Sequence, residues 1–160
     1  MLFSLTSVLT TQRYFEDIEV GTTEEFGEYH VTKAEITEFA EQYDPQPFHT
    51  DEEAAEESAF GELVASGWHT AAMSMRMLVE NYLGEQAGMG GRSADELRWE
   101  RPVKPGDTLS LRTEVVDKHR SESDPHRGYV DNYIEVLNQN DEVVLSYTVT
   151  GMVKRRNPGE

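Results

Sequence analysis

Two side chains that can exchange protons lie five positions apart in this chain, Asp44 and His49, within the segment Tyr43-Asp44-Pro45-Gln46-Pro47-Phe48-His49. A carboxylate and an imidazole together can hold a water molecule, take a proton from it and return one. Each proline fixes one φ angle and pushes the preceding residue toward extended geometry, so the segment is predicted to be a rigid, non-helical loop. Such a loop could aim both side chains at one point, although proline-rich segments with polar ends are also ordinary connectors.

A helix is predicted directly before this segment. Thr32 and Glu35 match the N-cap and N3 positions of a capping box, and apolar residues follow at helical spacing. Because Pro45 disfavours continuation, the helix should deliver Asp44 at its C-terminal end. Residues 22–31 alternate weakly and are interpreted as an edge strand.

A second helix is predicted to begin near Ser66 and Gly67 and to stop at Gly84. Its apolar stripe is broad and rich in methionine, so the helix is expected to be largely buried. Taken alone, the pair Ser66-Gly67 indicates a plain helix cap. A short acidic helix over 51–58 separates the proline-rich segment from this helix.

In the second half of the chain, the spacing of apolar residues changes from a helical period to alternation. Residues 88–93 are rich in glycine and are interpreted as a loop. Alternating apolar and polar residues predict three long strands over 108–118, 128–138 and 143–154, joined by short connections into an antiparallel meander. Helices followed by such strands indicate an α+β layer fold in which a curved sheet covers one central helix.

The composition limits the classes of function. The chain of 160 residues fits one domain, and it has no cysteine for disulfides, thiolate metal sites or a thiol nucleophile. The histidines lack ligand-like spacing, so no metal is expected. No apolar run approaches the roughly 18 residues that span a bilayer. Residues 1–13 lack the features of a signal peptide and are interpreted as a flexible extension, which makes a cytoplasmic protein the default expectation.

The charge is strongly negative, at -17 with 31 acidic residues against 14 basic ones. Such a field repels nucleic acid and anionic membranes, so neither is expected as a partner. The acidic residues lie on surface-like positions of every segment, and lysine is scarce. This pattern suggests a halophilic source, where salt screens the self-repulsion.

The chain resembles MaoC-like dehydratases and (R)-specific enoyl-CoA hydratases, which have the hotdog fold. The resemblance covers about residues 14–155, and separated motifs carry it in the family's order. These motifs are Tyr14-Phe15-Glu16-Asp17, Val20-Gly21, the segment from Asp44 to Asp51, Val64-Ala65-Ser66-Gly67-Trp68-His69-Thr70, Leu97-Arg98-Trp99 and Arg101-Pro102-Val103-Lys104-Pro105-Gly106-Asp107. The family pattern around the acidic residue is usually Asp-x-Asn-Pro-x-His, and this chain has Gln46 in place of the Asn.

The resemblance implies an α+β hotdog fold, a curved antiparallel sheet wrapped around a long central helix, as a single domain over 14–155 followed by a tail over 156–160. It also implies a homodimer or a multiple of dimers, because one hotdog leaves part of its sheet poorly covered.

The implied reaction is the reversible addition of water to a trans-2-enoyl-CoA, giving an (R)-3-hydroxyacyl-CoA, with an acyl-CoA as substrate and no further cofactor. Asp44 and His49 would hold the water. The backbone N–H of Gly67 would bind the negative charge that develops on the thioester oxygen. Ser66 borders the same spot, where its hydroxyl either assists or only caps the helix.

Two other functions are compatible with the same motifs. A hotdog acyl-CoA thioesterase would use the same oxyanion donor, with a carboxylate activating water toward the carbonyl carbon. A non-catalytic acyl-CoA-binding module would keep the fold without turnover. The paired His49 favours hydration. His69, beside Trp68, is interpreted as a packing residue outside the site.

The acidic surface leads to a prediction about salt. If the chain is adapted to high salt, its melting temperature rises between dilute buffer and molar KCl, because screening relieves repulsion among the carboxylates. Thermal unfolding followed by circular dichroism measures this, and an unchanged melting temperature would count against the halophilic interpretation.

Overall fold

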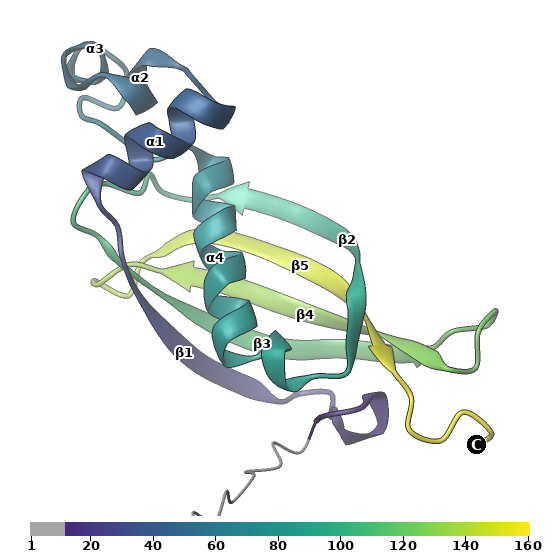
Figure 1. Cartoon of the computed structure of the whole chain (residues 1–160). Coiled ribbons are helices and arrows are strands. Elements are labelled where there is room, and N and C mark those ends of the chain that lie inside the picture. Colours follow the sequence, from purple (N-terminus) through teal and green to yellow (C-terminus); the bar gives the residue numbers. More distant parts are fainter. Residues whose placement is uncertain (1–11) are drawn as a thin grey trace, which may run out of the picture.

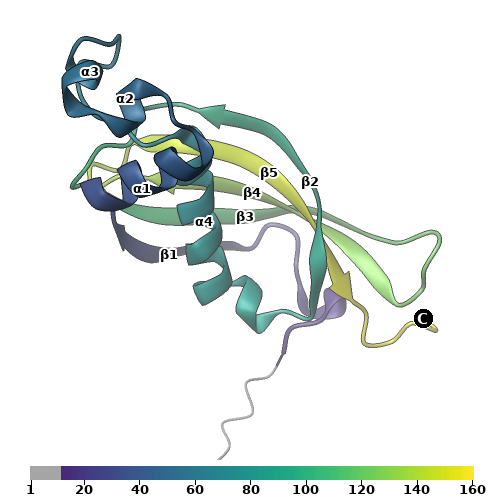
Figure 2. The same ribbon diagram turned by 45° about the horizontal axis from the view of Figure 1, so that its top comes forward.

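The computed structural model describes residues 12–160, in which a five-stranded antiparallel sheet curves around one long helix (Figures 1 and 2). The sheet order is β1-β3-β4-β5-β2, so β1 and β2 are its edges. The strands are β1 (Thr23–His30), β2 (Gly88–Trp99), β3 (Thr108–Arg120), β4 (Arg127–Leu137) and β5 (Val143–Lys154). Helix α4 (Gly67–Asn81) lies across the concave face, which confirms the predicted α+β fold class.

Three short helices gather at the N-terminal end of α4 (Figure 1). They are α1 (Lys33–Tyr43), α2 (Pro47–Thr50) and α3 (Glu52–Glu56). As predicted, the Thr32 hydroxyl caps α1 by accepting a hydrogen bond from the Glu35 N–H. Two single-turn 3₁₀ helices, η1 (Phe15–Asp17) and η2 (Leu83–Glu85), lie near the other end of α4.

One row of α4 residues faces the sheet. Ser66, Thr70, Ser74, Leu78 and Tyr82 follow one another at every fourth position, and each is at most 3% exposed. Residues at this spacing share one face of a helix. We call this row the inner ridge. Buried aliphatic side chains of β3, β4 and β5 complete the core beneath it.

The opposite side of α4 is uncovered, contrary to the expectation of a largely buried helix. Trp68, Met75 and Val79 are 59%, 43% and 49% exposed and form an apolar stripe along this side. The neighbouring edge strand β2 also presents Met89 and Trp99 to solvent. A single curved sheet can contact only one side of the helix it wraps.

Three further sequence interpretations are wrong. The glycine-rich residues 88–93 form the start of β2, where pairing with β5 through several register shifts overrides the loop preference of glycine. Residues 47–50 are one turn of helix rather than part of a non-helical loop, because Pro47 takes the first helical position, where its missing N–H costs nothing. Gly84 does not end α4, because the helix already ends at Asn81. Gly84 lies instead within the 3₁₀ helix η2.

The structure describes the C-terminal end of the chain fully and the N-terminal end from residue 12. The expectation for residues 1–13 falls mostly outside the described residues, and within them Arg13 pairs with η2 through its N–H and the Glu85 carbonyl. At the other end, Arg156 binds Asp17 and so ties the C-terminal segment to η1. Within residues 12–160, no helix is long and apolar enough to cross a membrane.

Candidate active site

Asp44 sits at the junction of α1 and the short α2. Its backbone N–H closes α1 by donating to the Ala40 carbonyl at 2.8 Å, and Pro45 prevents another turn. Its carboxylate accepts two hydrogen bonds, from the Gln46 amide at 2.8 Å and from the Ser66 hydroxyl at 2.7 Å. The Gln46 side chain therefore helps to hold Asp44.

These contacts keep Asp44 ionised. Burial acts to raise its pKa, but hydrogen bonds from Ser66 and Gln46 and the nearby His49 outweigh burial and leave the pKa of the carboxyl lowered. A folded-state pKa below the ordinary value means that the ionised carboxylate stabilises the fold above that ordinary pKa. This stabilisation is lost as the pH falls through the lowered value.

His49 is held in one orientation and one tautomer. The ring is 6% exposed, and its Nδ1 lies 2.7 Å from the Val64 carbonyl oxygen. A carbonyl can only accept a hydrogen bond, so we assign the proton to Nδ1. In its neutral form the ring presents the lone pair of Nε2, which lies 3.4 Å from Oδ2 of Asp44. The pair thus offers two acceptors side by side.

The N-terminus of α4 faces the same place. Ser66 is the N-cap and its hydroxyl accepts from the Trp68 N–H at 3.3 Å, while no acceptor is assigned to the Gly67 N–H among the described residues. This free donor and the helix dipole favour negative charge. Trp99 explains the glycine sterically, because a Cβ at Gly67 would lie 2.4 Å from the indole nitrogen.

A cavity of about 440 Å³ joins these groups. Asp44, His49 and Gly67 all line it, so the structure brings three of the four predicted site residues to one space. We call this space the dyad cavity. The fourth residue, Ser66, lies behind them and is fully buried, with its hydroxyl directed at Asp44. Most of the remaining wall is aromatic or aliphatic, from Phe48, Phe60, Val64, Trp68, Trp99 and Val103.

His69 lies outside the cavity lining. Its ring is buried and stacks on Phe39 of α1 with a centroid distance of 4.7 Å. Burial lowers the pKa of His69, so the neutral ring is favoured. Across residues 12–160, no group of three His, Asp or Glu side chains is arranged to hold a metal ion.

Sequence reasoning missed three contributors to this site. The carbonyl of Val64, which fixes the tautomer of His49, is backbone and leaves no signal in the side-chain pattern. The contact between Trp99 and Gly67 joins residues 32 positions apart. The bond from Gln46 to Asp44 lies inside the motif and was accessible from its spacing.

Comparison with known proteins agrees with this geometry. A family model described as "MaoC like domain" matches residues 17–136. A MaoC-like dehydratase from Rhodospirillum rubrum is 43% identical, with a TM-score of 0.80 over 90% of this chain and 98% of that one. The R-hydratase PhaJ1 from Pseudomonas aeruginosa is 26% identical, with a TM-score of 0.72 over 89% of this chain and 86% of that one.

Two curated relatives from bacteria also match. The uncharacterized protein YdeM of Bacillus subtilis is 27% identical over 88% of this chain and 98% of its own length. A 3-hydroxybutyryl-CoA dehydratase of Methylorubrum extorquens is 31% identical over 65% of this chain and 64% of its own length.

The double role of Ser66 leads to a prediction. Ser66→Ala removes the hydroxyl that holds Asp44, so the pKa of Asp44 rises toward its ordinary value. The variant also loses the N-cap of α4 and about 0.5–2 kcal/mol of unfolding free energy. Carbon-13 titration of the Asp44 carboxyl and urea unfolding measure the two effects. Ser58→Ala, which removes a hydroxyl bonded to the Ala55 carbonyl and the Phe60 N–H and not to Asp44, is the control and should leave the Asp44 titration unchanged.

Proposed function

The chain belongs to the MaoC-like dehydratase family, and we propose that it adds water reversibly to a trans-2-enoyl-CoA, giving an (R)-3-hydroxyacyl-CoA. The observation that carries the proposal is the pairing of Asp44 with a tautomer-fixed His49 opposite a free helix N-terminus. The names of two similar proteins, an R-hydratase and a 3-hydroxybutyryl-CoA dehydratase, support the reaction class.

The dyad positions the water. Oδ2 of Asp44 and the lone pair of Nε2 of His49 are both acceptors, 3.4 Å apart. One water molecule can donate a hydrogen bond to each, which leaves its own lone pairs directed away from the dyad. An enoyl group in the dyad cavity would meet this oxygen at Cβ.

His49 is assigned both proton transfers. Imidazole is a stronger base than a carboxylate, and the pKa of Asp44 is lowered further by its hydrogen bonds. As the water oxygen bonds to Cβ, its proton passes to Nε2. The imidazolium formed is stabilised by the Asp44 carboxylate and then returns a proton to Cα on the same face. Asp44 remains ionised throughout.

The α4 N-terminus stabilises the intermediate charge. As Cβ is attacked, negative charge moves onto the thioester oxygen. The Gly67 N–H and the helix dipole would bind that oxygen beside the aromatic side chains of Trp68 and Trp99, which line the same cavity. Gly67 is therefore assigned to transition-state binding, and Ser66 to positioning Asp44.

Incubation with crotonyl-CoA tests the function. A hydratase removes the enoyl absorbance without releasing free thiol, whereas free CoA would indicate a thioesterase. Binding of CoA esters with no turnover of any enoyl-CoA would indicate a non-catalytic module.

Matched substitutions test the roles within the dyad. Asp44→Asn and His49→Gln should each lower kcat by about 10²–10⁴. The larger fall is expected for His49→Gln, because an amide cannot take up and return the proton, whereas Asp44→Asn removes only the charge beside the imidazolium. Asp117→Asn and His119→Gln repeat the same chemical changes on β3, outside the dyad cavity, and should retain activity. Full turnover in both dyad variants would refute the assignment.

The uncovered side of α4 supports a homodimer. The apolar stripe adjoins the edge strand β2, which presents a row of unpaired backbone groups together with Met89 and Trp99. A second copy placed on this side would cover the stripe and pair the edge.

Light scattering in high salt should therefore give twice the monomer mass of 18.2 kDa or a multiple of it. Val79→Glu, at the C-terminal end of the stripe, should shift the mass toward the monomer. Val116→Glu on exposed β3 is the control. A monomeric mass for the wild-type chain would contradict the dimer.

A further inference from the structure

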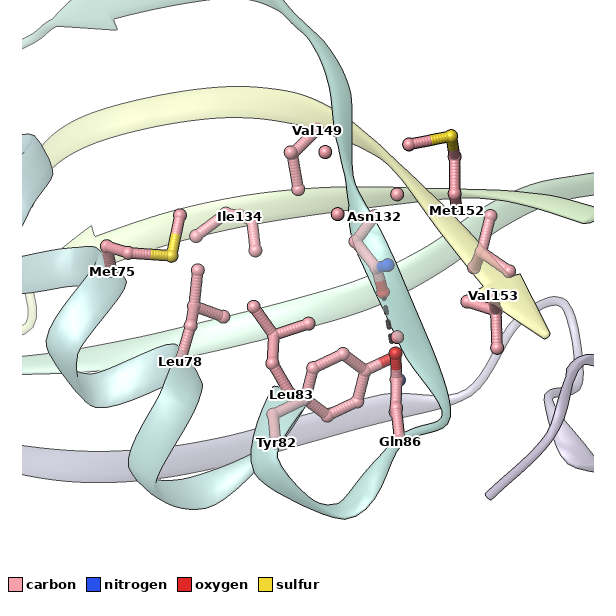
Figure 3. A pocket seen from close by; sticks show the side chains of 15 residues that line it. Met75, Leu78, Tyr82, Leu83, Gln86, Asn132, Ile134, Val149, Met152 and Val153 are labelled. Atoms are coloured by element: carbon pink, nitrogen blue, oxygen red, sulfur yellow. Dashed lines mark hydrogen bonds between the residues drawn. The ribbon is translucent and has the colours of Figure 1, made fainter. Parts of the chain in front are cut away.

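A second cavity lies under the C-terminal end of α4. It has a volume of about 280 Å³ and is bounded by α4, η2, β2, β4 and β5 (Figure 3). We call it the distal cavity. Its wall is mostly apolar, with one polar contact in which the Tyr82 hydroxyl donates to Asn132 at 3.0 Å. The apolar lining includes Leu78, Leu83, Val130, Ile134 and Val149.

The two cavities lie along the same helix. On the inner ridge, Thr70 lines the dyad cavity, and Leu78 and Tyr82 line the distal cavity. Ser74 is the ridge residue between Thr70 and Leu78. The helix therefore passes from one cavity to the other at Ser74.

Strand β5, beneath the helix, also runs from the dyad cavity to the distal cavity. Its residues alternate between the two faces, so Leu145, Tyr147 and Val149 share the concave face. Leu145 pairs in register with Trp99, which lines the dyad cavity, and Val149 lines the distal cavity. Tyr147 lies between them, as Ser74 does on α4.

Between the two cavities, Ser74 of α4 and Tyr147 of β5 are joined by a hydrogen bond. Their hydroxyl oxygens are 2.7 Å apart, and the residues are 0% and 5% exposed. Burial raises the pKa of Tyr147, so its hydroxyl keeps its proton and remains available for the bond. A hydrogen bond sealed from water holds the phenol ring in one position.

We infer that the Ser74–Tyr147 pair is a partition that closes the acyl end of the dyad cavity and restricts the substrate to short acyl chains. This inference rests on the proposed hydratase function and names its substrate class. The distal cavity is the space that a longer chain would need.

The test compares acyl chain lengths before and after the partition is removed. The double variant Ser74→Ala/Tyr147→Leu replaces both hydroxyl-bearing side chains with smaller apolar ones, which avoids an unpaired buried hydroxyl. The wild-type protein should hydrate crotonyl-CoA at least about tenfold faster than trans-2-dodecenoyl-CoA. The double variant should raise the dodecenoyl to crotonyl ratio of kcat/KM by about tenfold or more.

Two further variants separate the partition from general damage. Tyr147→Phe keeps the ring but removes the hydrogen bond, so a smaller rise in the same ratio is expected, and this variant serves if the double variant does not fold. Tyr133→Leu changes a tyrosine of β4 that pairs with Thr148 and so lies on the face of the sheet away from Tyr147, and it should leave the ratio unchanged. Equal turnover of both chain lengths by the wild-type protein would overturn the partition.

Binding of saturated esters tests the partition without catalysis. Butanoyl-CoA and dodecanoyl-CoA cannot be hydrated, and calorimetry gives their Kd ratio in each variant. A shifted ratio with no turnover of any enoyl-CoA would overturn the hydratase function but support the partition. Hydration of crotonyl-CoA would support the hydratase function, but if the variants left the chain-length ratios of kcat/KM and Kd unchanged, the partition would be overturned. Failure of both esters to bind would overturn both proposals.

Discussion

The Ser66 hydroxyl is the contact on which the site depends. It accepts from the Trp68 N–H to cap α4 and donates to the Asp44 carboxylate at the end of α1. One side chain thus fixes the start of the central helix relative to the acidic residue. Ser66 is fully buried, so its hydroxyl is not exposed to water. The distance between the dyad and the α4 N-terminus follows from this contact.

The two titratable groups of the site make different kinds of hydrogen bonds. Asp44 is surrounded by donors, which favour its charge, whereas His49 donates from Nδ1 to a carbonyl and keeps Nε2 free. The first group suits electrostatic support and the second suits proton transfer. Two neighbouring titratable residues thereby acquire separate roles from their hydrogen bonds, within a wall that is otherwise largely apolar.

Local chemistry accounts for what the sequence predicted well. The N-cap at Thr32, the helix end at Asp44 and the three alternating strands all depend on neighbours within a few residues. The loop predicted for the glycine-rich start of β2 is wrong for the opposite reason. Its conformation is imposed by pairing with β5, some 60 residues away, and no local preference competes with that ladder.

The sequence by itself identified the residues to which we assign the chemistry, because Asp44, His49 and the Ser66-Gly67 helix start belong to short motifs whose geometry is local. Only the tertiary structure decided how they act together. The tautomer of His49, the indole of Trp99 on Gly67 and the Ser74–Tyr147 bond each join distant segments. Such contacts exist only after the sheet has wrapped the helix, since packing sets their distances and spacing along the chain does not.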